Sequence, residues 1–163
     1  MEVEGGEVAA DVLGDAVSAY FANMPDHIYK IGQADFLDMV NAGEDITVLD
    51  IRSADDYAKG HVIGAVNAPW GSAVSDILSK IPSEKPLFVY CYSGQTAGHT
   101  VHTLNLAGFD ARSVNLGFNF GISKVDGYEA AIEETENTLT EDVTVIDATI
   151  QEALDAYFAG LAD

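Results

Sequence analysis

Residues 89–98 read Val89-Tyr90-Cys91-Tyr92-Ser93-Gly94-Gln95-Thr96-Ala97-Gly98, and this stretch decides the fold that we expect. An apolar run ends at Cys91, a short polar loop with a glycine follows, and a helical pattern then begins. The backbone N–H groups of such a loop point at the sulfur, and the helix N-terminus adds partial positive charge. This arrangement favours a thiolate over a thiol. The alternative interpretation is a free cysteine that packs as a small apolar side chain.

Short apolar runs alternate with helical patterns around this cysteine. The β-branched run 46–50 and the apolar run 86–91 are predicted to be buried strands, and residues 111–114 are predicted to be one more strand. Three patterns of apolar residues have helical spacing: 36–40, 74–81 (with Ser72 as the expected N-cap) and 97–107. This alternation indicates an α/β fold with a mostly parallel central sheet flanked by helices on both faces. Chemistry in such sheets lies at the carboxyl ends of strands, where Cys91 is found.

Further helices are expected at both ends of the chain. An apolar stripe from Val8 to Met24 predicts a helix that is ended by Pro25. The stretch from Glu129 to Glu141 is acidic and has few strong apolar positions, which indicates a connector. The predicted segments are a disordered acidic leader (1–7), the α/β domain with its added N-terminal helix (8–121), an acidic connector (122–148) and a terminal helix (149–163).

The terminal helix resembles the first one in sequence. Residues 153–163 (ALDAYFAGLAD) match residues 16–26 (AVSAYFANMPD) at six of eleven positions, at an offset of 137 residues. Similarity at a long period is typical of duplicated units. On that interpretation, Thr149-x-x-Glu152 is a capping box that opens the leading helix of a second repeat. Alternatively, two amphipathic helices share Ala and aromatic residues by chance.

The chain is strongly acidic. It has 27 Asp and Glu against 7 Lys and Arg, a formal net charge of −20 over 163 residues. Such a field repels phosphate backbones and anionic lipids, so we expect neither a nucleic-acid partner nor membrane insertion. No run reaches the roughly 20 apolar residues of a membrane span. No signal sequence stands at the start, which fits a cytoplasmic protein or an exported one whose leader is absent.

Cys91 is the single cysteine of the chain. A single cysteine excludes an internal disulfide and any multi-cysteine metal site. His99 and His102 have the i, i+3 spacing of one helix face, but the sequence indicates no third ligand beside them. We therefore expect no metal at this pair.

A second motif precedes the cysteine loop. Residues 49–69 contain Asp50-x-Arg52, an acidic-aromatic pair, Gly60-His61, and then Gly-Ala-x-Asn ahead of Pro69. The two motifs, in this order and at this spacing, resemble the rhodanese-like (thiosulfate sulfurtransferase-type) domain family over roughly residues 29–121. Two independent motifs make the resemblance far more specific than the short cysteine loop alone.

The resemblance implies a sulfurtransferase whose nucleophile, Cys91, carries a persulfide within a six-residue loop from Cys91 to Thr96. Its substrates would be a small sulfur donor (thiosulfate or a persulfide, including one on a protein) and a thiol or cyanide acceptor, with no cofactor. The loop residues whose N–H groups are implied to hold the outer sulfur are Tyr92, Ser93, Gly94, Gln95, Thr96 and Ala97. Supporting roles fall to an Asp50–Arg52 pair at the pocket edge and to His61 in its turn. Alternatively, Arg52 binds a donor anion.

Two features depart from the family pattern. Many members have Arg or Lys in the loop, whereas this loop carries no positive charge and has Thr96 at its sixth position. The segment Leu116–Gly121 has aromatic residues where relatives often show a Gly-rich turn and a Trp. Both features leave the identity of the donor open.

Two other functions compete with sulfur transfer. The related cell-cycle phosphatases have a loop that is one residue longer and ends in the Arg needed for phosphoryl oxygens, and this loop has neither feature. A catalytically weak binding or sulfur-carrier module with the same fold is the other alternative.

Overall fold

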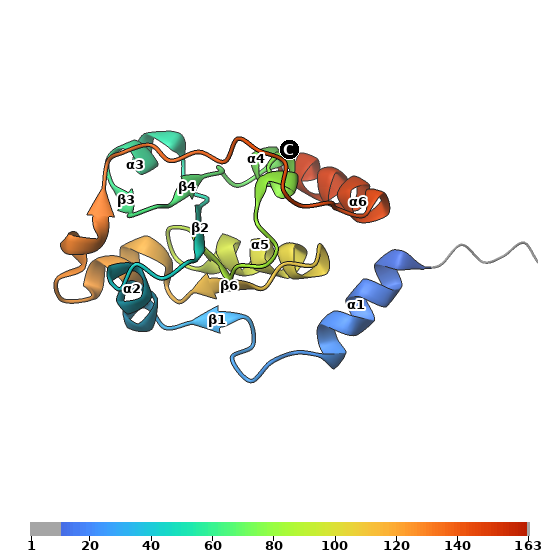
Figure 1. Ribbon diagram of the computed structural model, residues 1–163, viewed down its shortest axis with the longest axis horizontal. Helices are drawn as coiled ribbons and strands as arrows, with labels where there is room; N and C mark the ends of the chain where they lie inside the picture. Colours follow the sequence, from blue (N-terminus) through green and yellow to red (C-terminus); the bar gives the residue numbers. More distant parts are fainter. Residues whose placement is uncertain (1–10, 163) are drawn as a thin grey trace, which may run out of the picture.

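The centre of the structure is a five-stranded sheet in the order β1-β6-β5-β2-β4, in which every pairing is parallel (Figure 1). This computed structural model describes residues 11–162. The three strands predicted from the sequence are β2, β5 and β6, next to one another in the sheet. The strands are β1 (Lys30–Ile31), β2 (Thr47–Asp50), β4 (Val66–Asn67), β5 (Leu87–Tyr90) and β6 (Ala111–Val114).

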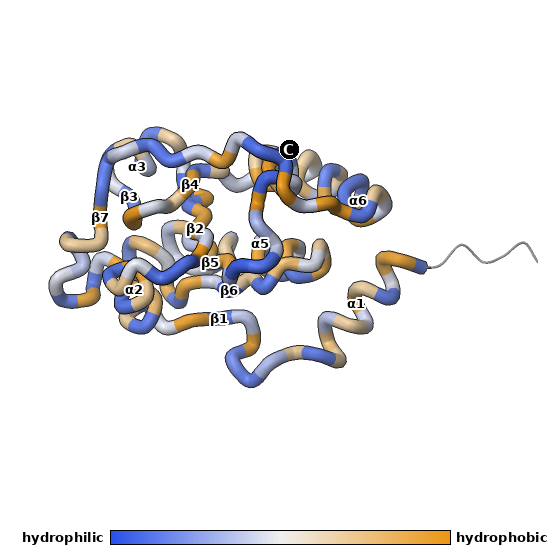
Figure 2. The backbone as a smooth tube through the Cα atoms, in the orientation of Figure 1, coloured by the Kyte–Doolittle hydropathy of each residue, from blue (hydrophilic) through white to orange (hydrophobic). Residues whose placement is uncertain are grey.

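Helices cover both faces of the sheet, and this confirms the predicted fold class. Alternate side chains of the central strands enter two separate apolar cores. Leu49 and Val89 join the core under α4, α5 and α6, whereas Val48 and Phe88 join the core under α2. Figure 2 shows the hydrophobic colouring along β2 at the centre of the molecule. The covering helices are α2 (Gln33–Asn41), α3 (Ala54–Ala58), α4 (Ser72–Asp76), α5 (Gln95–Leu106) and α6 (Ala148–Ala159).

The helix expected after Ser72 is shorter than its apolar pattern suggests. Gly71 is the N-cap residue of α4, and Ser72 is the first helical residue and makes no side-chain cap. The helix ends at Asp76, and a tighter turn, η1 (Leu78–Lys80), follows. Leu78 and Ile81 are fully buried, because the turn keeps both side chains facing the core. The apolar residues thus lie on one side, as the spacing predicted, although the α-helix is followed by a 3-10 turn.

The two terminal helices pack on the same domain. The first, α1 (Val12–Ala22), rests against α5 with none of its residues fully buried. The expected leader, 1–7, lies outside the described residues. In α6, Ile150, Leu154 and Phe158 enter the core beside α4. Asp147 caps α6 by accepting from the N–H groups at 149 and 150, so the expected Thr149 capping box is replaced by a cap two residues earlier.

Residues 122–137 pack closely on the domain, which differs from the connector expected there. Ile122 and Ala131 are fully buried, and β7 (Ile132–Glu133) pairs antiparallel with β3 (His61–Val62). The short turns η3 (Ile122–Lys124) and η4 (Tyr128–Ala131) lead into β7, and the chain then runs past α3 and β4 to α6 (Figure 1). Four larger apolar side chains of this segment also pack against the core under α2: Ile122, Val125, Tyr128 and Ile132. Beyond them, Asn137 donates hydrogen bonds to Tyr57 and to the Ala65 carbonyl, which a count of apolar positions does not detect.

Candidate functional site

Cys91 directly follows β5, and its sulfur faces the start of α5. The N–H groups of Gly94 and Ala97 donate to Sγ, at N···S distances of 3.1 and 3.4 Å. Gly94 is the N-cap residue of α5, with a left-handed φ of 92° that favours glycine. Two N–H groups and the helix N-terminus together stabilise negative charge on the sulfur. The Cys91 residue is only 2% exposed.

The remaining loop residues surround the thiol without a hydrogen bond to it in the described chain. Tyr92, Ser93 and Gln95 are exposed, and Thr96 is half-buried. Of the six N–H groups that the resemblance implies, the structure therefore brings those of Gly94 and Ala97 to Sγ. The others form the outer part of the loop.

The segment at 116–121, noted in the sequence for its aromatic residues, holds the cysteine loop from outside through backbone contacts that the sequence did not predict. In the helical turn η2 (Gly117–Gly121), the N–H of Phe118 donates to the carbonyl oxygen of Cys91 at 2.7 Å. The N–H of Asn119 donates to the carbonyl oxygen of Tyr92 at 2.9 Å. A Cβ on Gly117 would lie 2.6 Å from the Cys91 carbonyl oxygen, so only glycine permits this approach. The glycines at both ends of η2 are the sequence signal that could have indicated the clamp.

Tyr92 ties the loop to the start of α3. Its hydroxyl accepts from the N–H of Ser53 at 3.1 Å and donates to Asp56 Oδ2 at 2.6 Å. This hydrogen bond from Tyr92, followed by one from Lys59, holds the pKa of Asp56 well below its usual range. The cysteine loop is thus fixed on two sides, by η2 through the backbone and by α3 through a side chain.

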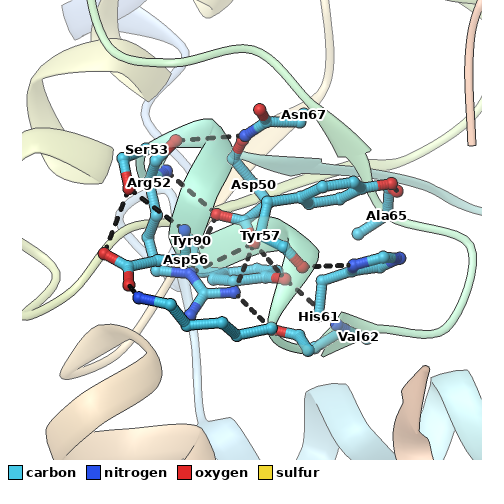
Figure 3. A network of polar contacts seen from close by, with 12 residues as sticks. Asp50, Arg52, Ser53, Asp56, Tyr57, His61, Val62, Ala65, Asn67 and Tyr90 are labelled. Carbon is cyan, nitrogen blue, oxygen red and sulfur yellow. Dashed lines mark hydrogen bonds and ion pairs between the residues drawn. The ribbon is translucent and has the colours of Figure 1, made fainter. Parts of the chain in front are cut away.

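Asp50 and Arg52, at the end of β2, form a buried ion pair, as Figure 3 shows. Arg52 Nε donates to both carboxylate oxygens at 3.0 and 3.1 Å, and Nη2 donates to Oδ2 at 2.6 Å and to the Gly60 carbonyl at 2.8 Å. Tyr90 donates its hydroxyl to Asp50 Oδ2 at 2.7 Å. The two charged residues are 0% and 4% exposed. Both carboxylate oxygens of Asp50 thus accept hydrogen bonds from neighbouring residues of the protein.

The aromatic rings above Arg52 complete this network. Its guanidinium carbon lies 4.0 Å from the Phe118 ring centroid, a cation–π contact. Burial alone would lower the pKa of Arg52, but the hydrogen bonds and charge of Asp50 raise it overall. Burial, then the charge of Asp50, raises the pKa of Tyr90 well above its usual value, so Tyr90 stays a neutral donor. These contacts support the structural role expected for Arg52.

Arg52 also borders a cavity of about 680 Å³ between α3 and the η4–β7 segment. Lys59 adds a second positive side chain there, and Asp56, Glu129 and Glu133 add negative ones. Because Arg52 is 4% exposed and bound to Asp50, it offers little free charge to a donor anion.

His61 is fully buried and faces backbone carbonyls with both ring nitrogens. Nδ1 lies 2.8 Å from the Tyr57 carbonyl oxygen, and Nε2 lies 2.8 Å from that of Thr135 (the first contact is drawn in Figure 3). Its ring stacks on Tyr57 with centroids 3.6 Å apart. The structure therefore places His61 between α3 and the strand segment around β7, where it joins the two elements.

Residues 11–162 contain no group of three His, Cys, Asp or Glu side chains placed to hold a metal ion. The helices in this range are all too short or too polar to cross a membrane. His102 lies against the Tyr20 ring, with centroids 4.4 Å apart, and His99 is exposed.

The fold and the site together define a parallel α/β domain with a cysteine loop at a strand–helix junction. The family model described as "Rhodanese-like domain" matches residues 32–120, more than half of the chain. The chain belongs to the rhodanese-like domain family.

Two relatives have low sequence identity to this chain, and both are longer proteins. A Mycobacterium bovis protein named "Putative thiosulfate sulfurtransferase 2" is 24% identical over 151 residues, which cover 74% of this chain and 46% of that protein. A Bacillus subtilis protein named "Putative sulfur carrier protein YrkF" is 27% identical over 82 residues, 50% of this chain and 44% of that protein. The chain thus spans about half the length of these relatives.

Solved structures show the same fold. The rhodanese-like domain of an Anabaena protein, solved by NMR, is 22% identical, with a TM-score of 0.53 and coverage of 73% of this chain and 92% of that domain. A rhodanese-like domain protein from Staphylococcus aureus is 20% identical, with a TM-score of 0.52 and coverage of 56% and 88%. At this identity the likeness concerns the fold alone.

Proposed function

We propose that this protein is a sulfurtransferase that moves sulfane sulfur through a persulfide on Cys91. The observation that carries the proposal is the geometry at Sγ, where two backbone N–H groups point at the only thiol of the chain. Membership of the rhodanese-like family supports the same chemistry, as do the relatives named for sulfur transfer and sulfur carriage.

The reaction has two nucleophilic steps. With thiosulfate, the Cys91 thiolate attacks the outer sulfur, a new S–S bond forms, and the old S–S bond breaks with its electron pair leaving on sulfite. The Cys91 persulfide anion then gives its outer sulfur to a thiolate or to cyanide, which becomes a persulfide or thiocyanate, and the Cys91 thiolate returns. Each step conserves charge, so the protein supplies only a nucleophile and a site that stabilises an anion.

The backbone dipoles of the loop replace the cation that many family members place there. The N–H groups of Gly94 and Ala97, at the N-terminus of α5, favour the thiolate before attack and the persulfide anion after it. We propose the N–H groups from Tyr92 to Ala97 as the holders of the outer sulfur, since they belong to the loop and to the first turn of α5. Preorganised N–H donors of this kind need no rearrangement during the reaction.

The experiment is mass spectrometry of the intact protein after incubation with thiosulfate. The expected result is the addition of one sulfur atom, which cyanide or dithiothreitol removes. A Cys91→Ser variant that folds normally should gain no sulfur. The proposal fails if the wild-type chain gains no sulfur from thiosulfate or from a persulfide donor, or if the variant retains transfer activity.

Burial of the sulfur favours a second candidate, a catalytically weak sulfur-carrier module. At 2% exposure, Cys91 is reached by a donor only when neighbouring groups move aside. A carrier should form the persulfide in a single slow turnover, and an enzyme should release thiocyanate repeatedly with excess thiosulfate and cyanide. Steady-state thiocyanate release therefore separates the two.

A further inference from the structure

A small cavity of about 280 Å³ lies beside the cysteine loop, on the face of the sheet that α5 covers. Ser93 and Gly94 of the loop form part of its wall. Gly94 borders both the cavity and the sulfur, because its N–H donates to Cys91 Sγ at 3.1 Å. The volume is just below the roughly 300–1,000 Å³ of sites for drug-sized ligands, so the cavity suits a smaller molecule.

Three polar side chains reach this cavity from the edge of the sheet, where β1 lies beside β6 (Figure 1). Lys30 of β1 and Ser113 of β6 are partners in the parallel register. Asn115 follows Ser113 by two residues, and its N–H continues the ladder by donating to the Ile31 carbonyl at 2.9 Å. Because side chains alternate along a strand, Ser113 and Asn115 share one face of the sheet. Lys30, Ser113 and Asn115 all line the cavity.

The polar ends of these three side chains are unpaired. Within residues 11–162, they have no hydrogen-bond or ion-pair partner. Ser113 is only 6% exposed, and a buried hydroxyl without a protein partner is normally paired with a water or a ligand. The cavity therefore presents one ammonium, one hydroxyl and one amide group to whatever occupies it.

The charge around this cavity is unusual for the chain. Asp and Glu outnumber Lys and Arg by 27 to 7 in the sequence, whereas the described lining of this cavity has Lys30 and no acidic residue. By contrast, the larger cavity beside Arg52 is lined by Asp56 and Glu133 among other acidic residues. The local charge of the smaller cavity thus favours an anion.

The other walls of the cavity are fixed and leave room for a ligand. Tyr20 of α1 stacks on Tyr29 with ring centroids 4.6 Å apart, and the Tyr29 hydroxyl donates to the Tyr20 carbonyl at 3.1 Å. Both tyrosines line the cavity on the side of α1. On the α5 side, a Cβ at Gly98 would meet no atom within 4 Å. Packing therefore does not require this glycine, although glycine is unfavourable inside a helix.

We propose that this cavity binds the carboxylate of a small thiol, such as a cysteine derivative, that accepts sulfur from Cys91. The Lys30 ammonium pairs with the carboxylate, and the Ser113 hydroxyl and the Asn115 amide donate hydrogen bonds to it. A single lysine matches the single charge of a carboxylate, whereas a dianion would bring more charge into the acidic field. The inference rests on the proposed function, because it names the acceptor of that reaction.

The acceptor step is where a positive side chain near the loop has the largest effect. The acceptor attacks as its thiolate, a bond forms to the outer sulfur of the Cys91 persulfide, and the S–S bond of that persulfide breaks with its electron pair on Sγ. Two anions must therefore meet in a chain of net charge −20. The cysteine loop has no Lys or Arg to reduce their repulsion, and Lys30 supplies a positive charge from β1.

The test uses the full chain after it has been loaded with sulfur from thiosulfate and separated from the donor. N-acetylcysteine and N-acetylcysteine amide are the two acceptors, because they differ in the carboxylate. Mass spectrometry follows the loss of the persulfide and gives a second-order rate constant at low acceptor concentration. Each variant is compared with the wild type for the same acceptor, so the different reactivities of the two thiols cancel.

Lys30→Met should lower the rate constant for N-acetylcysteine about three- to fivefold, the effect of one exposed ion pair, and should lower that for the amide much less. Lys30→Arg should keep most of the wild-type rate constant. Ser113→Ala, which breaks no hydrogen bond of the fold, should also slow transfer to N-acetylcysteine. Lys124→Met is the matched control, since Lys124 is exposed, lies in η3 and changes the net charge by the same amount. It should change neither rate constant.

Two outcomes would overturn the inference and leave the proposed function standing. In the first, Lys30→Met slows transfer to the acid and to the amide equally, so Lys30 does not bind the carboxylate. In the second, Lys124→Met slows transfer to the acid as much as Lys30→Met does, so the net charge and not the cavity is responsible. A wild-type chain that takes up no sulfur from any donor would refute the proposed function, and the inference with it.

Discussion

Replacement of Arg52 by methionine separates a structural role of this residue from a role in donor binding. Methionine keeps most of the apolar length of the side chain and removes the guanidinium. The change deletes three hydrogen bonds to Asp50 and one to the Gly60 carbonyl. It leaves the fully buried Asp50 carboxylate with the Tyr90 hydroxyl and one backbone N–H as partners.

The magnitude follows from the burial of the pair. Loss of one partner of a buried ion pair costs about 3–5 kcal/mol, because the other charge stays in the interior. For a chain of this size, that loss lowers the unfolding temperature by roughly 6–20 °C. The double variant Asp50→Asn, Arg52→Met should recover part of the loss, since no unpaired charge is then buried.

Urea unfolding followed by far-UV circular dichroism measures the free energy of unfolding of the four proteins in this cycle. Persulfide formation from thiosulfate is measured on the same samples at a temperature where all are folded. The reasoning is refuted if Arg52→Met keeps its stability while its reaction with thiosulfate collapses. Arg52 would then bind the donor anion.

Three other predictions concern the charge of the protein, the cysteine loop and the β7 segment. The net charge of −20 repels dianionic thiosulfate. Because the Debye length falls from about 30 Å at 0.01 M KCl to about 8 Å at 0.15 M, kcat/KM for this donor should rise over that range. The kcat/KM for an uncharged donor in the same assay should change little. Tyr92→Phe should slow persulfide formation about tenfold, the rate equivalent of one hydrogen bond, and should raise the pKa of Asp56 in an NMR titration. Hydrogen bonds from the Asn137 side chain and from the Gly64 N–H lower the pKa of Glu133. These bonds therefore stabilise the fold at pH values above the ordinary glutamate pKa of 4.5, and this stability is lost as the pH falls. Glu133→Gln should make the free energy of unfolding in urea less dependent on pH below about 4.5, and an unchanged pH dependence would contradict this.

The parts of the fold that rest on local pattern could be predicted from the sequence. The predicted runs 46–50 and 86–91 are apolar and short, and both contain central parallel strands. The loop after Cys91 combined a glycine with a helical pattern, and Gly94 adopts the left-handed turn at the helix start. In each case the residues that determine the structure are neighbours in the chain.

The parts that depend on contacts between distant residues could not be predicted. The η2 clamp holds the cysteine loop through backbone groups, which every residue has, and only the glycines at its ends hint at close approach. His61 meets the carbonyl of Thr135 across 74 positions of sequence. The acidic stretch from Glu129 to Glu141 suggested a connector, because the sequence does not show that Ile132 pairs with the distant Val62 in β3.

A cysteine loop without Lys or Arg should select other sulfur donors than a loop that carries a positive side chain. Backbone N–H groups at Sγ carry partial charges at fixed positions. In the proposed reaction, they stabilise the same persulfide anion whichever donor supplied the sulfur. A Lys or Arg in the loop would also attract an anionic donor before the reaction, and none is present between Cys91 and Ala97. Discrimination among donors is therefore left to the exposed loop residues Tyr92, Ser93 and Gln95 and to the acidic field around them. Since that field repels anions, we expect this site to favour a neutral or weakly charged persulfide over thiosulfate.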